Sequence, residues 1–156
     1  MDKKSDKNLR EVMGCTCLRI RRTSRRMTQV YDRALAQAGF TVNQFGLLAN
    51  LLGVEIVRGE GLSIGTLADR LGTDPTTLNR TLKPLQVKGL LKDSADPADR
   101  RVRVVRITAK GKRELLDAIP LWREAQAHVE RALGIKATSA LNELLDRSND
   151  RLAQIA

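Results

Sequence analysis

Five polar and basic side chains between residues 76 and 83 are spaced as on the outer side of one helix. They are Thr76, Thr77, Asn79, Arg80 and Lys83, and they lie opposite or beside an apolar stripe of Leu78, Leu82 and Leu85. Hydroxyl, amide and guanidinium groups can hydrogen-bond to base edges, and ammonium groups can bind phosphate. The pattern predicts a DNA-reading helix in which the threonines, the asparagine and Arg80 contact bases, while Lys83 and Lys88 contact phosphate.

A charged loop further along the chain supplies a second group of basic side chains. Arg100 and Arg101 lie next to Asp96 and Asp99, between two β-like runs, and Arg103 follows in the second run. An arginine at the tip of a thin loop can enter the minor groove, where the negative potential is strongest. A carboxylate two residues before Arg101 can hold its guanidinium. Arg101 is therefore predicted to probe the minor groove.

These two groups and the helix caps beside them form the predicted DNA-binding set. It consists of Ser63, Thr73, Asp74, Thr76, Thr77, Asn79, Arg80, Lys83, Lys88, Asp99, Arg100, Arg101 and Arg103.

The two cysteines and the single histidine offer little other chemistry. Cys15 and Cys17 are two residues apart, and on one helix such positions point about 200° from each other, so a disulfide within the chain is unfavourable. We expect structural thiols. A thiol-based redox-sensing regulator stays open as an alternative, because neighbouring arginines favour the thiolate. His128 has no second histidine for a metal site, and we expect no metal and no cofactor.

The aromatic residues are few, and the chain contains none of the common enzyme motifs. Tyr31, Phe40, Phe45 and Trp122 are expected in the core, although an aromatic side chain near a helical cleft can also line a ligand pocket. The chain contains no phosphate-binding loop, no dinucleotide-binding glycine pattern, no HExxH sequence and no nucleophile elbow. We therefore expect no catalytic activity.

The elements that position these residues are mostly helices. A frayed start precedes a long helical pattern from Leu9 to Gly39; Thr41 and Gln44 form a capping box for the next helix. Ser63 caps a short helix to Leu71, and Asp74 with Pro75 starts another that ends at Gly89. Further helices begin at Thr108, with a bend at Pro120, and near Thr138.

Two β-like runs, Leu90–Ser94 and Val102–Thr108, separate the fourth and fifth helices and indicate a hairpin. The adjacent Val104 and Val105 break the alternation of the second run, so its register is not defined by the sequence. The element order is α-α-α-α-β-β-α-α: a mainly α fold with a small β-hairpin wing, in which two short helices and the hairpin form a winged helix-turn-helix.

Composition and charge agree with this organisation. Of the 156 residues, 42% are hydrophobic but only 3% are aromatic, which favours helix packing. The formal charge is +10, and residues 58–113 carry 13 basic and 6 acidic groups, the largest surplus in the chain. A localised basic surface is typical of a polyanion-binding protein. No apolar stretch is long enough for a membrane span or a signal peptide, so a cytoplasmic protein without a membrane partner is expected.

The sequence around the hairpin resembles one family of regulators. The runs are Leu82-Lys83-Pro84-Leu85-Gln86-Val87-Lys88-Gly89-Leu90-Leu91, Asp96-Pro97-Ala98-Asp99-Arg100-Arg101 and Ile107-Thr108-Ala109-Lys110-Gly111. They are similar to the MarR family of winged helix-turn-helix bacterial transcriptional regulators, and the likeness covers nearly the whole chain.

The resemblance implies a homodimer that binds double-stranded DNA at a pseudo-palindromic operator. Residues 1–40 and 112–156 would form the helical dimerisation region, and residues 41–111 the winged helix-turn-helix, within one integrated domain. The resemblance also implies a repressor released by a small, often aromatic, effector. Leucine-rich terminal helices need a partner that buries their apolar faces, which agrees with the dimer.

Two other classes of function use the same features. A nonspecific or architectural nucleic-acid-binding protein would bind with a steep salt dependence but little sequence preference. A protein-interaction module would use the winged helix against another protein and would not bind DNA even at low salt.

Overall fold

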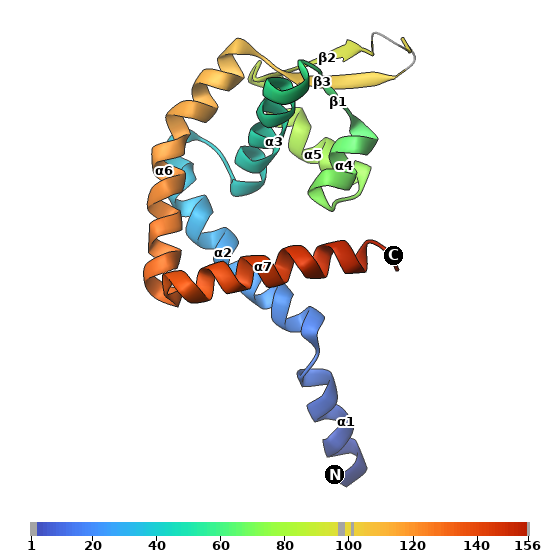
Figure 1. Ribbon diagram of the computed structural model, residues 1–156, viewed down its shortest axis with the longest axis vertical. Coiled ribbons are helices and arrows are strands. Elements are labelled where there is room, and N and C mark those ends of the chain that lie inside the picture. The colour runs from blue at the N-terminus through green and yellow to red at the C-terminus, as the bar shows by residue number, and fades with distance from the viewer. Residues whose placement is uncertain (1–2, 97–98, 101, 156) are drawn as a thin grey trace. The chain divides into compact units, whose positions relative to one another are not determined.

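The computed structural model describes residues 3–96, 99–100 and 102–155, and it is mostly helical with a small antiparallel sheet (Figure 1). The helices are α1 (Lys3–Met13), α2 (Thr16–Leu35), the 3-10 helix η1 (Ala36–Ala38), α3 (Val42–Arg58), α4 (Ile64–Leu71), α5 (Pro75–Val87), α6 (Ala109–Leu133) and α7 (Ile135–Leu152). The strands are β1 (Leu62–Ser63), β2 (Leu91–Ala95) and β3 (Arg103–Ile107).

The chain divides into two compact units. We call Ala34–Arg123 the winged-helix unit, and Met1–Arg33 together with Glu124–Ala156 the terminal-helix unit. The winged-helix unit holds α3, α4, α5, the sheet and the first part of α6. Each unit is described by itself below.

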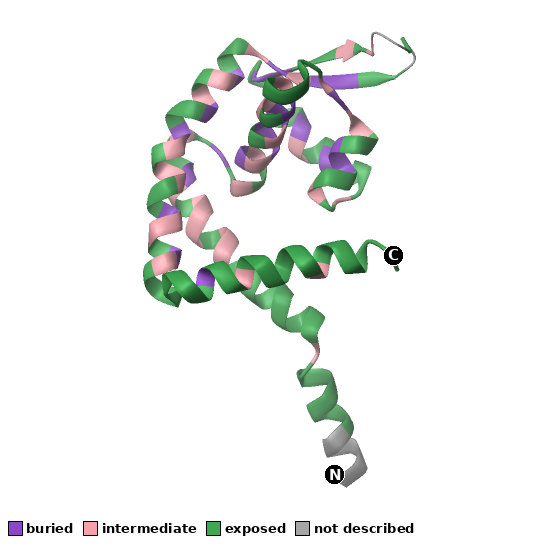
Figure 2. Cartoon of the chain, viewed as in Figure 1, coloured by how far each residue is buried: buried purple, intermediate pink, exposed green. Residues whose placement is uncertain are grey.

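The core of the winged-helix unit is built mainly from leucines of α3, α4 and α5 and from the sheet, with Leu35 at the end of α2 and Leu90 just before β2 (Figure 2). The largest fully buried side chains are Leu35, Leu47, Leu48, Leu51, Leu67, Leu78, Leu82, Leu85, Leu90 and Val105. Full burial of one such side chain stabilises a fold by about 1.5–3 kcal/mol. The predicted apolar stripe of α5 is confirmed by this packing, which fixes the rotation of α5 about its axis.

The predicted hairpin exists, but it belongs to a three-stranded sheet. Strand order is β1-β3-β2, with Leu62 paired to Val105 and Leu91 paired to Ile107. The sequence did not indicate β1, because a two-residue strand has no periodicity to detect. β3 is therefore the central strand, and Val104 and Val105 are both buried, one on each face. This explains the adjacent valines that break the alternation.

The expectation of one helix from Leu9 to Gly39 is wrong. α1 ends at Met13 and α2 begins at Thr16, while helix is present from Lys3, where a frayed start was expected. At the break, the N–H of Gly14 is within hydrogen-bonding distance of both the Arg10 and Glu11 carbonyls, at 3.0 and 3.1 Å. Glycine is a poor helix former, and such shared bonds are common at helix ends.

Other element boundaries differ by a few residues. α7 begins at Ile135 rather than near Thr138, directly after Gly134, whose φ of 86° only glycine adopts readily. α6 continues as a helix through Pro120.

The terminal-helix unit joins α2 to the second part of α6. The Tyr31 hydroxyl donates a hydrogen bond of 2.5 Å to Gln126 Oε1, and Ala125 and Val129 are buried. Burial raises the pKa of Tyr31 above its usual 10.0, and the nearby Glu130 carboxylate acts in the same direction.

Among the described helices, none alone is long and apolar enough to cross a membrane. One bent pair, Asn8–Ala38 with Val42–Arg58, reaches the required length and composition together. The second member of this pair buries its leucines in the core of the winged-helix unit.

Candidate nucleic-acid interface

Side-chain caps begin α4 and α5, and one glycine forms the turn between them. Ser63 Oγ accepts a hydrogen bond from the Thr66 N–H at 3.1 Å, and Asp74 Oδ1 accepts one from the Thr77 N–H at 2.9 Å. Gly72 has φ 58°, a left-handed conformation that ends α4 within one residue. Both predicted caps are confirmed: Ser63 sets the start of α4, and Asp74 sets the start of α5.

Asp74 is an ionised cap. Hydrogen bonds from the side chain and then the backbone of Thr77 hold the pKa of Asp74 below its usual 3.8. A carboxylate at this place also interacts favourably with the positive end of the helix dipole. The start of α5 is therefore fixed by a charge that persists into mildly acidic solution.

The outer side of α5 carries the predicted reading residues. Its exposed polar and basic side chains are Thr76, Thr77, Asn79, Arg80 and Lys83. On the opposite side, Leu78, Leu82 and Leu85 are at most 1% exposed. The fold thus buries one side of α5 completely and leaves hydrogen-bond donors and two cations on the other.

The wing is braced by a carboxylate that the sequence analysis missed. Asp93 on β2 accepts a hydrogen bond from Gln86 Nε2 of α5 at 2.8 Å, and it forms an ion pair with Arg103 on β3. Arg103 therefore has an ion-pair partner, although 73% of its side chain stays exposed. No local pattern marks Asp93, because its partners are seven and ten residues away on other elements.

The loop at the wing tip is described only in part. The N–H of Asp96 donates to the Val102 carbonyl at 2.8 Å, and the Val102 N–H donates to the Asp99 carbonyl at 2.9 Å. Arg100 is exposed. Arg101 lies outside the described residues, so its predicted contact with Asp99 and with the minor groove stays a prediction.

The junction between the wing and α6 explains the Thr108-Ala109-Lys110-Gly111 sequence. Thr108 Oγ1 accepts the Gly111 N–H at 3.0 Å, which confirms the predicted cap of α6. The same hydroxyl lies 2.8 Å from the Gly89 carbonyl oxygen and donates to it. A Cβ at Gly111 would lie 2.3 Å from the Leu90 carbonyl oxygen. Only glycine fits there.

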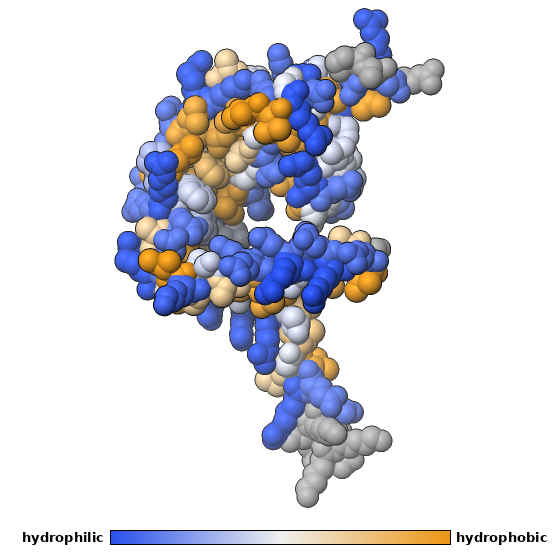
Figure 3. All heavy atoms as spheres, in the orientation of Figure 1, coloured by the Kyte–Doolittle hydropathy of each residue, from blue (hydrophilic) through white to orange (hydrophobic). Residues whose placement is uncertain are grey.

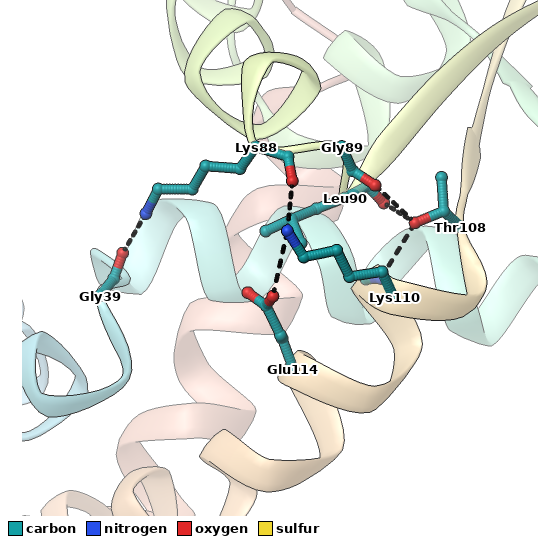
Figure 4. Close-up of polar contacts among 8 residues, drawn as sticks. Gly39, Lys88, Gly89, Leu90, Thr108, Lys110 and Glu114 are labelled. Carbon is teal, nitrogen blue, oxygen red and sulfur yellow. Dashed lines mark hydrogen bonds and ion pairs between the residues drawn. The ribbon is translucent and has the colours of Figure 1, made fainter.

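Lys88 and Thr73 sit apart from the exposed row on α5. The Lys88 Nζ donates to the Gly39 carbonyl at 3.0 Å (Figure 4). It also lies 5.9 Å from the centre of the Phe40 ring. Thr73 is half-buried and lines a cleft of about 330 Å³ between α3 and the start of α5. The assignment of both to DNA contact stays a prediction.

The aromatic side chains proposed for a ligand pocket do not form one group within either unit. Phe45 and Trp122 stack with their ring centres 6.4 Å apart and a 9° angle between the planes. Phe40 is buried under Lys88, and Tyr31 belongs to the terminal-helix unit. These aromatics do not line the cleft beside Thr73 or the cleft beside Arg58 and Arg70.

The cysteines and histidine carry no metal site. Cys15 lies in the break between α1 and α2, and Cys17 is exposed at the start of α2, so the two do not share one regular helix. His128 is exposed. Among the residues that the structure describes, no three His, Cys, Asp or Glu side chains are grouped to hold a metal ion.

Comparison with known proteins places this geometry in a family. The sequence profile of the MarR family matches residues 38–102. Among solved structures, the transcriptional regulator MosR of M. tuberculosis in complex with DNA is 32% identical, with a TM-score of 0.77 over 90% of this chain and 98% of that chain. A search of curated protein sequences returned no match.

More distant structures share the fold. CouR of Rhodococcus jostii RHA1 bound to p-coumaroyl-CoA is 21% identical, with a TM-score of 0.69 over 83% of this chain and 88% of that chain. A mutant MarR of E. coli complexed with operator DNA is 20% identical, with a TM-score of 0.76 over 88% and 95% of the two chains. Members of this family regulate transcription and are not enzymes. The chain belongs to the MarR family of DNA-binding transcriptional regulators.

Proposed function

We propose that this chain is a homodimeric repressor that reads a pseudo-palindromic operator with α5. In this account Thr76, Thr77, Asn79 and Arg80 contact base edges, Lys83 contacts phosphate, and the wing with Arg100 and Arg101 enters the minor groove. Ser63 and Asp74 hold the ends of the two helices in place. The repressor leaves DNA when a small aromatic effector binds.

One observation carries the DNA-reading part of the proposal: the polar side chains on the exposed side of α5 are all hydroxyl, amide or basic groups, opposite a fully buried side. Val87, which is 82% exposed, adds an apolar residue at the C-terminal end of the same helix. An ordinary solvated helix face carries both signs of charge. Between the end of α4 and the end of α5, the only acidic residue is Asp74. Its carboxylate accepts a hydrogen bond from the Thr77 N–H. A negatively charged partner with hydrogen-bonding groups fits such a surface.

Selection of bound sequences from a random DNA pool tests this proposal. A dimer with two reading helices should enrich two inverted half-sites, centred about one helical turn of 10–10.5 base pairs apart. Enrichment of no sequence, with tight binding at low salt, would favour the architectural alternative. Absence of binding at low salt would favour a protein-interaction module.

The homodimer is supported by apolar side chains that the terminal-helix unit leaves exposed. They are Leu9, Val12, Met13, Leu18, Ile20, Leu133, Ile135, Leu144, Leu145, Leu152 and Ile155. Hydrophobic atoms reach the surface along α2 and at both ends of α7 in Figure 3. Exposed apolar patches of this extent mark interaction surfaces, and a two-fold partner offers a matching set. Residues 1–40 and 112–156 are accordingly proposed as the dimerisation region.

Effector release is proposed by analogy with the family, since CouR, of the same fold, is bound to p-coumaroyl-CoA. Thermal unfolding in the presence of aromatic acids and their thioesters tests this idea, because a ligand that binds the native state raises the unfolding temperature. The same compounds should then weaken operator binding and raise expression of a reporter gene. A compound that raises the unfolding temperature without either effect would contradict release.

A further inference from the structure

The C-terminal end of α5 lacks one of its helical hydrogen bonds. Pro84 lies inside α5 and has no N–H, so the Arg80 carbonyl receives no hydrogen bond from the residue four positions later. α5 ends at Val87, and Gly89 turns the chain with φ 71°. The last carbonyls of α5 accept hydrogen bonds from the turn that follows, in which the Gly89 N–H donates to Gln86 and the Leu90 N–H to Leu85, each at 2.9 Å. Contacts from other segments join this turn to the rest of the winged-helix unit.

Three side chains from outside or beyond α5 supply these contacts (Figure 4). Lys110 Nζ, at the start of α6, donates to the Lys88 carbonyl at 2.8 Å. Thr108 Oγ1 donates to the Gly89 carbonyl at 2.8 Å. Lys88 Nζ reaches in the other direction and donates to the Gly39 carbonyl at 3.0 Å. These bonds join segments 49, 22 and 19 residues apart in sequence, all within the winged-helix unit.

The ammonium of Lys88 is engaged in a defined local site. Gly39 is held in the left-handed conformation with φ 72°, which directs its carbonyl within reach of Lys88. The ammonium also lies over the ring of Phe40, which is 4% exposed, so the contact combines a hydrogen bond with a cation–π interaction. Lys110 is held in turn by Glu114 at 3.7 Å. Both lysines are exposed, as Lys83 is, but their ammonium groups are bonded to protein groups.

We propose that Lys88 and Lys110 are positioning residues for DNA recognition. They fix the end of α5 to the Gly39 turn and to α6, and so hold the reading side of α5 at the angle that the operator requires, without contacting DNA themselves. The proposal rests on the proposed function, in which α5 reads the operator. It assigns to Lys88 a role different from the phosphate contact predicted from the sequence.

Salt dependence separates a positioning residue from a phosphate contact. Each phosphate contact adds about 0.9 to the slope of log affinity against log salt, so loss of a contact lowers that slope by about one. A positioning residue acts through the geometry of other contacts, so its loss lowers operator affinity while the slope stays the same. Random DNA, which is bound without groove reading, should be little affected.

The test compares four single lysine-to-methionine variants of the full chain by fluorescence anisotropy. Lys88→Met and Lys110→Met test the proposal, and Lys83→Met is the phosphate-contact comparison. Lys136→Met, exposed on α7, controls for the loss of one charge, after sedimentation velocity has shown that it assembles like the wild type. We expect the first two variants to lose about fivefold in operator affinity relative to Lys136→Met, corresponding to about 1 kcal/mol. Their salt slopes and random-DNA affinities should equal those of Lys136→Met. Lys83→Met should lower the slope by about one.

Each other outcome overturns a defined claim. A slope lowered by about one in Lys88→Met would make this lysine a phosphate contact. The positioning role would be rejected if Lys88→Met and Lys110→Met bound the operator as tightly as Lys136→Met does. It would also be rejected if they had a lower unfolding temperature and lost affinity equally for operator and random DNA. If the positioning role is rejected in one of these ways but Lys83→Met still lowers the slope, the proposed DNA contacts of α5 are retained. An unchanged slope in Lys83→Met rejects the proposed contacts of α5, and the positioning role with them.

Discussion

At Gly111 the absence of a side chain allows α6 to begin directly against the end of α5. The backbone there approaches the Leu90 carbonyl so closely that a Cβ would lie 2.3 Å from its oxygen and 2.9 Å from Ile107 Cγ1. The neighbouring Thr108 hydroxyl joins the same two segments. The glycine at position 111 thus has a steric cause. This cause could not be deduced from spacing alone, because Leu90 is 21 residues away in sequence.

Substitution of Gly111 by alanine should destabilise the protein by about 1–3 kcal/mol, because a backbone oxygen must move. The free energy of unfolding in urea measures this. Gly53→Ala is the matched control: Gly53 lies within α3 with no atom within 4 Å of an added Cβ, so alanine should be neutral or stabilise by up to about 1 kcal/mol. Equal effects of the two substitutions would contradict the steric account.

Asp74 makes stability depend on pH in a defined direction. Its native pKa lies below 3.8, so the unfolded chain binds the proton first as pH falls. The stabilising contribution of Asp74 is complete above its unfolded pKa and is lost as pH falls through the native value.

The Asp74→Asn variant keeps a good cap without the charge. The wild type should therefore lose stability relative to this variant between about pH 5 and pH 3, measured as the difference in unfolding free energy. A difference that stays constant from pH 7 to pH 3 would show that the Asp74 carboxylate is not engaged as described.

At the scale of elements, the sequence predicts what depends on neighbouring residues. The capping box of α3, the caps of α4 and α5, the turn at Gly72 and the apolar stripe of α5 are local patterns, and the structure confirms them. β1 and the break at Gly14 were missed. β1 exists only because Leu62 pairs with Val105, 43 positions later, and the break reflects a single weak helix former.

The candidate site divides in the same way. The rotation of α5 follows from its own leucines, and so the exposed row could be predicted from the sequence. The braces of α5, such as Lys88 to Gly39 and Gln86 to Asp93, join elements that only the fold brings together. From the sequence alone, Lys88 beside the reading helix is interpreted as a phosphate contact, because its partner, the Gly39 carbonyl, is known only from the fold.

Asp93 should couple the wing to α5, since it binds Gln86 and Arg103 together. Asp93→Asn is expected to weaken operator binding about threefold, while stability changes by less than about 1 kcal/mol because the ion pair is exposed. Gel-shift titration and urea unfolding measure the two quantities. Asp117→Asn, an exposed carboxylate on α6, controls for the change of charge. Operator affinity equal to that control would show that the wing is positioned without Asp93.

At the scale of the whole molecule, the terminal-helix unit leaves apolar side chains exposed, and the proposed homodimer would bury them. Leu144 and Leu152 on α7 are 56% and 55% exposed. Replacing both by glutamate should place charges in the proposed dimer interface and give a monomer in sedimentation velocity experiments. Val87→Glu, at an 82% exposed position in the winged-helix unit, should remain dimeric. A dimeric Leu144→Glu, Leu152→Glu variant would move the interface elsewhere.

Membership of a regulator family is consistent with this whole-molecule organisation, but sequence-specific reading by α5 is the central claim. Its most direct test is the ratio of affinities for a selected operator and for random DNA of equal length at one salt concentration, in wild type, Arg80→Ala and the exposed control Arg123→Ala. We expect a wild-type ratio of at least about 10³, retained in the control. In Arg80→Ala the ratio should fall about tenfold or more. A wild-type ratio near one, or an equal ratio in Arg80→Ala and the control, would contradict the account.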